Sequence, residues 1–225
     1  MKTLATFLAV VTCVFVHGQD NHLTPEISKT IFKVSPFHFT QNTLKVGIET
    51  FNTAKSKSLS IYGGVRTGGD DEDPYAGSDN FDGVLGEIQY KKYVLPLKEY
   101  TSKRNNTYSQ GVYAGVFIQG GNYTGTRLYQ EYFYDPNTGN STTTDFRYKE
   151  DAWNAAIGFT LGAQRVFWNT LFVDVYIGGG LQVADRTLSG NIPTQPYYDF
   201  YVNNSFQPGY EGIIPKIGIQ IGMGL

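Results

Sequence analysis

The chain has 225 residues with 18 basic and 20 acidic side chains, which give a formal net charge of −2. It contains 17 tyrosines, 15 phenylalanines and 26 glycines, and only 17% of its residues are charged. The many aromatic residues exclude an intrinsically disordered chain, and the balanced charge gives no sign of a nucleic-acid-binding protein. The composition therefore favours a single all-β domain.

The N-terminal segment has the pattern of a secretory signal peptide. A basic residue precedes an apolar run at 4–16, and a candidate cleavage site follows Gly18. The run is shorter than the ~20 residues that a transmembrane helix needs. Cys13, the single cysteine, lies inside it and lacks the small preceding residue of a lipoprotein signal. We expect 1–18 to be a signal peptide and 19–225 to form one domain without disulfides or thiolate metal ligands.

Alternating apolar and polar residues mark the rest of the chain. Near the C-terminus, Ile217, Ile219 and Ile221 alternate with Gly218 and Gln220. The same period of two recurs in seven earlier segments: 32–37, 44–51, 58–66, 84–94, 112–119, 153–164 and 171–183. This period is typical of β-strands whose two faces have different surroundings. We therefore expect eight strands of about 9–13 residues, a length that crosses a bilayer.

The two faces of these segments have unusual chemistry. One face carries large apolar residues, and the other carries Gly, Gln, Tyr and charged residues. A water-soluble barrel would turn its apolar face inward, whereas a membrane barrel turns it toward lipid. The sequence therefore predicts an all-β fold, a single eight-stranded antiparallel transmembrane β-barrel with an up-and-down meander order.

The predicted connections give the barrel an orientation. The three longest follow the third, fifth and seventh strands and therefore share one end of the barrel: 67–83, 124–150 and 185–209. The turns at 52–57 and 166–170 are short and lie at the other end, where 97–109 is the longest connection. Because membrane barrels carry their long loops on the outer side, we expect three loops at the cell surface and the N-terminus in the periplasm.

Several motifs add a resemblance to a known group of proteins. They lie at 31–37, 44–49, 86–93 and 111–115 and in the Gly/Ile-rich C-terminal segment. In these motifs the whole of 19–225 resembles the small eight-stranded outer-membrane β-barrel proteins of Bacteroidota, which include a family of unassigned function. Leu225 departs from the aromatic last residue that the assembly machinery recognises in many outer-membrane proteins. The resemblance implies a monomer in the bacterial outer membrane, with outer-membrane lipid, lipopolysaccharide and the outer-membrane assembly machinery as partners.

Eight charged residues fall on the face predicted to line the barrel interior. They are Lys33, Lys45, Glu49, Arg66, Glu87, Lys91, Asp174 and Lys216. Side chains just fill the interior of an eight-stranded barrel, and an unpaired buried charge costs several kcal/mol. We predict an ion-pair network that plugs the lumen; the alternatives are a narrow conduction path and, less favoured, a catalytic pair of carboxylates.

We also expect particular neighbours for Lys216 at the seam between the last and first strands. Lys216 should neighbour Lys33 across the seam. Asp174 is the nearest acidic partner in strand order, and Glu49 and Glu87 are expected to reach across the narrow lumen.

No enzyme site, cofactor or metal centre is predicted. His22 and His38 are the histidines that follow the signal peptide, and no Gly-x-Ser-x-Gly motif is present. A weak candidate for divalent cations is an acidic loop of Asp70, Asp71, Glu72 and Asp73. Its carboxylates suit Ca²⁺ or Mg²⁺, but their spacing does not match a calcium loop, so a solvated loop is the favoured interpretation.

The sequence therefore predicts a non-enzymatic outer-membrane β-barrel with a plugged polar lumen, three long surface loops and a structural or surface-interaction role. The alternatives are a minor channel for small solutes and, less favoured, a lipid-modifying enzyme at the barrel rim. The tyrosine-rich segments 129–134 and 197–201 are expected to extend strands above the membrane. The glycines at 120–121 and 178–180 are expected to give curvature and room for large neighbours.

Overall fold

The computed structural model describes residues 29–36, 42–68, 81–101, 107–135, 139–168, 170–190 and 208–225. In these ranges the chain forms eight β-strands: β1 (Thr30–Val34), β2 (Thr43–Phe51), β3 (Lys57–Arg66), β4 (Phe81–Thr101), β5 (Thr107–Asp135), β6 (Asn140–Phe167), β7 (Leu171–Gly190) and β8 (Gly212–Gly224). No helix in the same ranges is long and apolar enough to cross a membrane.

The eight strands form one antiparallel sheet that closes on itself. Each strand pairs with the next along the chain, and β8 pairs back to β1, so the sheet is a closed barrel. At this seam Phe32 lies opposite Met223 and Lys33 lies opposite Gly222. Closure gives each of the eight strands a hydrogen-bonded neighbour on both sides. The prediction of an all-β, eight-stranded, antiparallel sheet in up-and-down order is confirmed.

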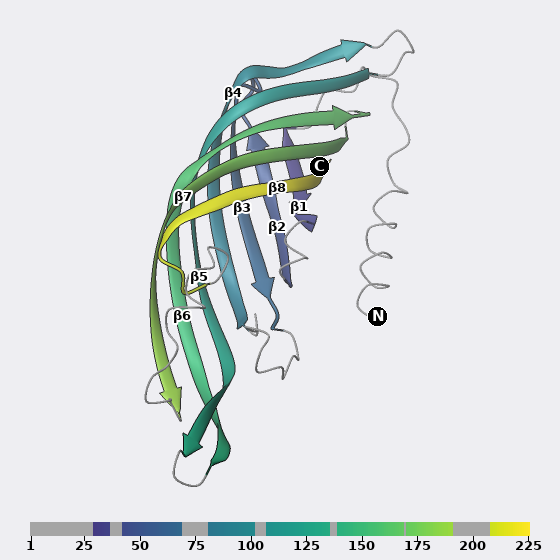
Figure 1. Ribbon diagram of the computed structural model, residues 1–225. Helices are drawn as coiled ribbons and strands as arrows, with labels where there is room; N and C mark the ends of the chain where they lie inside the picture. Colours follow the sequence, from purple (N-terminus) through teal and green to yellow (C-terminus); the bar gives the residue numbers. More distant parts are fainter. Residues whose placement is uncertain are drawn as a thin grey trace.

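The strand lengths differ from the prediction of about 9–13 residues. β4, β5, β6 and β7 have 21, 29, 28 and 20 residues, whereas β1 has only 5. Figure 1 shows the β5–β6 hairpin extending well beyond the other strands at the bottom of the view. It pairs continuously from Tyr108 opposite Phe167 to Asp135 opposite Asn140.

Two predicted surface loops are therefore partly strand. Most of 124–150 forms the outer part of the β5–β6 hairpin, and 185–190 belongs to β7. These extensions carry many Thr and Tyr residues, which favour strands, but they lack the large apolar face that marked the other segments. The expected strand extension at 129–134 is confirmed, since it lies within β5. The segment 197–201 lies outside the described residues.

The long connection predicted at 97–109 has a similar explanation. Lys98 pairs with Gln110 and Thr101 pairs with Thr107, so the β4–β5 hairpin continues to within a few residues of its tip. The register shifts near Leu95, which indicates a β-bulge. Val94 and Leu95 are 71% and 60% exposed, so two successive side chains point outward there. A bulge redirects side chains in this way.

The faces of the barrel have the predicted inside-out chemistry. On β8, Ile217 and Ile219 are 51% and 44% exposed, whereas Lys216 and Gln220 are 9% and 1% exposed. The same alternation runs along the other strands, with charged, amide and aromatic side chains inside. The expected assignment of polar residues to the interior is therefore confirmed.

Glycines make room in this narrow interior for tyrosine rings. Tyr62 lies opposite Gly47 on the neighbouring strand, and Tyr113 lies opposite Gly162. A Cβ atom on Gly47 would lie 2.2 Å from Cδ1 of Tyr62, and one on Gly162 would lie 2.4 Å from the Tyr113 ring. Each ring thus lies directly across the neighbouring backbone. At 178–180 the glycines instead allow close approach of β6, as a Cβ on Gly178 would lie 2.0 Å from the Phe159 carbonyl oxygen.

The first testable prediction compares an inward glycine with an outward one. Gly47→Ala pushes a Cβ atom into the Tyr62 ring and is expected to lower the free energy of unfolding by about 1–3 kcal/mol. Gly63→Ala is the control, because a Cβ there meets nothing within 4 Å. Urea unfolding of the purified, folded variants measures both effects. Equal loss of stability in the two variants would contradict the packing of Tyr62 on Gly47.

Candidate functional site in the barrel interior

Charged side chains gather in the interior in two groups. The four-charge cluster consists of Lys33 on β1, Glu49 on β2, Lys91 on β4 and Asp174 on β7. The three-charge cluster consists of Lys45 on β2, Glu87 on β4 and Lys216 on β8. Because the members of each cluster come from strands that are not all neighbours, each cluster links separate parts of the barrel wall.

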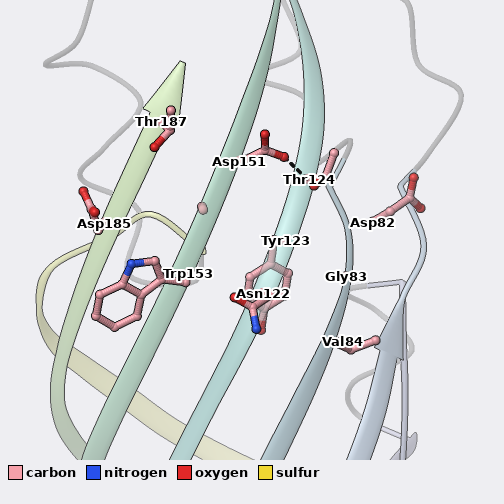
Figure 2. A pocket seen from close by; sticks show the side chains of 11 residues that line it. Asp82, Gly83, Val84, Asn122, Tyr123, Thr124, Asp151, Trp153, Asp185 and Thr187 are labelled. Carbon is pink, nitrogen blue, oxygen red and sulfur yellow. Dashed lines mark hydrogen bonds between the residues drawn. The ribbon is translucent and has the colours of Figure 1, made fainter. Parts of the chain in front are cut away.

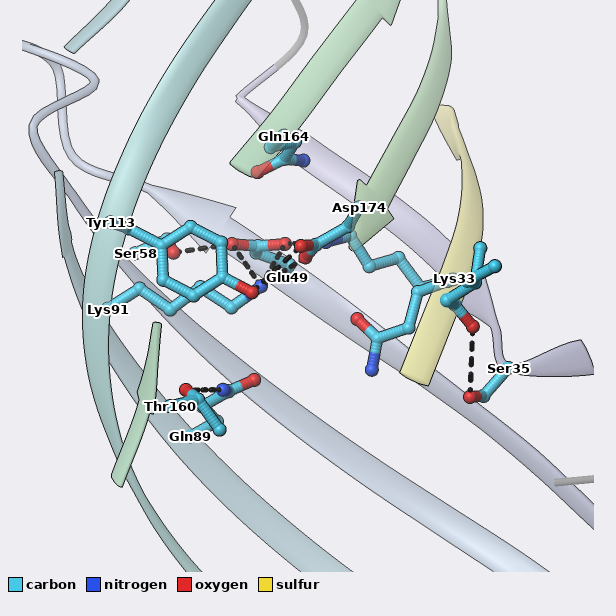
Figure 3. A network of polar contacts seen from close by, with 12 residues as sticks. Lys33, Ser35, Glu49, Ser58, Gln89, Lys91, Tyr113, Thr160, Gln164 and Asp174 are labelled. Carbon is cyan, nitrogen blue, oxygen red and sulfur yellow. Dashed lines mark hydrogen bonds and ion pairs between the residues drawn. The ribbon is translucent and has the colours of Figure 1, made fainter. Parts of the chain in front are cut away.

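The four-charge cluster is fully buried and electrically balanced. The Lys33 ammonium lies 2.7 Å from Asp174 and also contacts Glu49. The Lys91 ammonium lies 2.6 Å from Asp174 and 3.3 Å from Glu49. Each lysine therefore contacts both carboxylates, and two positive charges meet two negative charges (Figure 3). Such mutual pairing offsets the desolvation cost of burying four ions.

Hydroxyl groups complete the surroundings of these carboxylates. Tyr113 donates a hydrogen bond of 2.8 Å to Asp174, and Ser58 donates one of 2.5 Å to Glu49 (Figure 3). The hydroxyl oxygen of Tyr93 also lies 3.3 Å from Glu49. The Lys91 ammonium also lies 4.6 Å from the centroid of the Tyr113 ring. The carboxylates thus accept hydrogen bonds from several directions, as buried charges require.

The three-charge cluster carries one more positive than negative charge. The ammonium groups of Lys45 and Lys216 lie 2.5 and 2.8 Å from the same oxygen of Glu87. Lys216 also donates a 2.7 Å hydrogen bond to the side-chain carbonyl of Gln119. Its ammonium lies 3.9 Å from the centroid of the Phe117 ring. The amide oxygen and the aromatic ring supply the partial negative charge that a second carboxylate would otherwise provide.

Apolar side chains close the interior at the end with the short turns. Ile31, Phe51, Tyr93, Tyr113, Val166, Phe172 and Tyr176 form one buried cluster. Its rings pack closely, with centroids 5.8 Å apart for Phe51 and Tyr93 and 5.4 Å apart for Tyr93 and Tyr113. The four-charge cluster therefore lies behind an apolar layer that separates it from this mouth of the barrel.

The chain itself enters the interior toward the opposite end. The carbonyl of Pro208 accepts a 3.0 Å hydrogen bond from Asn154, and the carbonyl of Tyr210 accepts a 2.8 Å bond from Gln182. Tyr210 packs on a second apolar cluster of Phe117, Ala156 and Ile214. The segment just before β8 is thus bound by inward side chains of β6 and β7, and it narrows the interior above the three-charge cluster.

Seven of the eight predicted interior charges take part in these two clusters. The eighth, Arg66, is buried at the end of β3 and belongs to neither cluster. The ion pairs among these seven residues form two clusters rather than the single network that was expected.

The expected seam contact of Lys216 with Lys33 was wrong, whereas Glu87, one of the carboxylates expected to reach across the lumen, is its partner. Lys33 lies opposite Gly222 rather than beside Lys216, and Lys216 binds Glu87 rather than Asp174. The reason is stagger, because the short β1 pairs only with the last residues of β8. Lys216 lies six residues before Gly222, well along the barrel from the seam pairs, and there the carboxylate of Glu87 is within reach.

Other predicted site residues cannot be placed in the fold. The signal segment 1–18, both histidines His22 and His38, and the acidic loop of Asp70, Asp71, Glu72 and Asp73 lie outside the described residues. Within the described ranges, no group of three or more His, Cys, Asp or Glu side chains could hold a metal ion.

Several neutral contacts of the interior were not predicted. Tyr62 donates a 2.8 Å hydrogen bond to Gln220, Gln89 donates a 2.7 Å bond to Thr160, and Tyr93 donates to Gln164. Alternation places each of these side chains inside, but it carries no information about which strands face each other across the lumen. The pair of Glu150 and Arg186, 3.7 Å apart, was missed because both residues fell in predicted loops.

The exterior also has a distinct distribution of charge. At the end with the long connections, the outward charged residues next to the apolar rows are acidic: Asp82, Asp151, Asp185 and Glu211. At the end with the short turns they are basic: Lys57, Lys92 and Arg165. In the described strands, the exterior rows between these two sets carry no charged side chain.

An open pocket of about 530 Å³ lies at the acidic end (Figure 2). Asp82, Thr124, Asp151 and Thr187 form one row across four strands, and Trp153 lies in the next row. Thr124 donates a 2.6 Å hydrogen bond to Asp151, and Lys149 lies 3.0 Å from its other oxygen. Both contacts hold the pKa of Asp151 below its usual value.

Comparisons with protein-family models, with curated proteins and with solved structures gave no match for this chain.

The second testable prediction concerns Glu87. Glu87→Gln leaves the buried ammonium groups of Lys45 and Lys216 without their shared carboxylate, and the expected loss is about 3–5 kcal/mol in the free energy of unfolding. Adding Lys216→Met to Glu87→Gln should recover part of this loss, because one stranded charge is removed. Urea unfolding of the single and double variants measures the coupling.

Asp151→Asn provides the matched control. It breaks an exposed ion pair of similar length, with Lys149, and should leave the unfolding midpoint almost unchanged. Strictly additive effects of Glu87→Gln and Lys216→Met would contradict the shared buried contact.

Proposed function

We propose that this chain is an integral β-barrel protein of a bacterial outer membrane, without catalytic activity, whose role is structural or interactive at the cell surface. The observation that carries the proposal is a continuous apolar belt on the barrel exterior. Every strand contributes to it, and one exposed member from each is Phe32, Ile48, Ile61, Ile88, Val116, Phe159, Ile177 and Ile219. A ring of this kind would be unfavourable in water but is the lipid-facing surface of a membrane barrel.

The height of the belt supports this interpretation. On β6 the outward residues between Trp153 and Arg165 are all apolar: Ala155, Ile157, Phe159, Leu161 and Ala163. Arg165 lies twelve positions after Trp153 in the chain. At ~3.3 Å per residue and a tilt of ~45°, that span is about 28 Å along the barrel axis. The apolar band of outer-membrane barrels is ~25 Å tall.

The limits of the belt also match a membrane environment. The two tryptophans of the chain, Trp153 and Trp168, lie near its opposite ends, and both are exposed. Tryptophan is enriched where lipid headgroups meet water. The charged outward residues lie at or beyond these limits, where long side chains reach the headgroups at low cost.

The interior supports a structural role over conduction or catalysis. Both ion clusters are buried, and their charged groups contact one another rather than an open path. The apolar cluster at the short-turn end and the segment at 208–211 narrow the lumen on either side of them. We therefore assign the charges to stabilising the barrel and joining its walls.

The orientation and partners follow from the same proposal. The β5–β6 hairpin and the long connections face the cell surface, where they meet lipopolysaccharide and other surface partners. The short turns face the periplasm. The signal peptide at 1–18 directs secretion, the assembly machinery inserts the barrel, and the monomer belongs with the small outer-membrane barrels of Bacteroidota that it resembles.

The third testable prediction uses the depth of a charge on the exterior. Phe159→Arg places a cation in the middle of the belt and is expected to destabilise the inserted barrel by about 2–4 kcal/mol. Thr187→Arg is the control, because Thr187 is also outward but lies beyond the belt. Refolding into phospholipid vesicles is measured by the gel mobility of unheated against boiled protein and by urea titration.

Two results would contradict membrane insertion. One is a wild-type protein that stays in solution without detergent and migrates identically before and after boiling. The other is an equal effect of the two arginine substitutions on vesicle-refolded protein.

The fourth testable prediction separates the proposed role from a channel and from an enzyme. Refolded wild-type protein in planar bilayers should show no steady ion conductance, because paired charges and aromatic rings fill the lumen. Phospholipid and lipopolysaccharide incubated with it should remain chemically unchanged by mass spectrometry. Steady conductance would replace the proposal with a solute channel, and hydrolysis or acyl transfer would replace it with a rim enzyme.

A further inference from the structure

A groove marks the exterior of the barrel at the basic, short-turn end. It has a volume of about 370 Å³ and is lined mainly by outward residues of β4, β5, β6 and β7. Its floor is Ala163, whose neighbours on the adjacent strands are Val112 and Val175. The small alanine between two larger exposed side chains creates the depression. The groove opens on the apolar belt and is continuous with it.

The β-bulge in β4 builds one wall of this groove. Strict alternation would turn Leu95 inward after the outward Val94, yet Leu95 is exposed and lies opposite Val112. The redirected side chain therefore adds apolar surface beside Ala163. A bulge that interrupts a regular ladder at one place is a local device for aiming a side chain.

The rim end of the groove is polar and positively charged. Arg165 and Gln110 lie opposite each other on β6 and β5, one outward row from Ala163 and Val112. The Arg165 guanidinium lies 5.0 Å from the centroid of the Phe167 ring, which positions it at the groove mouth. Successive outward rows are ~6.6 Å apart along a strand. The Arg165 guanidinium and the Gln110 amide thus lie at the rim end of the apolar groove.

We propose that this groove binds one glycerophospholipid of the adjacent leaflet, with Arg165 and Gln110 on its phosphate and an acyl chain along Val112, Ala163 and Val175. The proposal rests on the membrane role argued above. Charge complementarity favours this occupant, because guanidinium groups hold phosphate oxygens through paired hydrogen bonds. The other described outward charges at this end, Lys57 and Lys92, are also basic, so this end of a second copy would offer Arg165 no described outward carboxylate.

The test uses folded protein in detergent micelles, titrated with dioleoylphosphatidylglycerol and analysed by native mass spectrometry. Wild-type protein should retain one lipid molecule. Arg165→Gln should raise the dissociation constant by about tenfold through the loss of a charge-assisted contact. Ala163→Phe should fill the groove and abolish retention of the lipid. Dioleoylglycerol, which has the acyl chains without the phosphate, should not be retained.

Two matched controls keep the test specific. Lys92→Gln removes another outward charge near the same end, and Ala114→Phe enlarges another outward alanine; neither residue lines the groove. Both variants should bind the lipid like the wild type. Equal weakening by Arg165→Gln and Lys92→Gln, equal effects of the two phenylalanine substitutions, or a protein dimer in place of the lipid complex would each overturn the proposal.

Insertion into vesicles is measured separately for every variant. Wild-type protein that inserts but retains no phosphatidylglycerol overturns the lipid site and leaves the membrane role standing. Wild-type protein that does not insert overturns both. If Ala163→Phe does not fold, Arg165→Gln against Lys92→Gln decides the result.

Discussion

The architecture depends on one constraint, which is that charges inside a narrow closed sheet must find partners there. Side chains fill the interior of an eight-stranded barrel, so water cannot solvate an isolated ammonium or carboxylate. Lys33, Lys91, Glu49 and Asp174 meet this constraint as a balanced set of four. Their four strands are thereby joined through the lumen as well as around the wall. The period-two alternation of each strand places the charged residues inside and the apolar residues outside.

The second cluster shows how the barrel manages an excess of positive charge. Glu87 is shared by Lys45 and Lys216. The Lys216 ammonium also donates a hydrogen bond to Gln119 and lies over the ring of Phe117. Neutral groups with partial negative charge thus substitute for a second carboxylate. The arrangement couples β2, β4, β5 and β8, so the last strand is joined to the centre of the sheet as well as to its neighbours.

Much of this structure could be predicted from the sequence, and the limits have physical causes. Period-two alternation correctly placed Lys33 and Lys216 inside and Ile217 outside, because it reports only which face a residue occupies. It could not select Glu87 over Asp174 and Glu49 as the partner of Lys216, since that contact depends on the stagger between strands, which alternation leaves open. Apart from 129–134, the β5–β6 extension was missed, because the apolar face that marks the other strands is absent from it. Leu95 was missed because a bulge breaks the pattern itself.

The short first strand has a consequence for how the barrel is closed. β1 meets β8 through only four residue pairs, and these join positions separated by nearly the whole chain. The other contacts join strands that are consecutive in the chain and therefore close much shorter loops. The seam therefore joins the positions most distant in the sequence while forming the fewest residue pairs. Backbone pairing alone therefore holds the two ends of the meander through few residues, and the buried Lys33, which reaches Asp174 on β7, adds an ion pair to that junction.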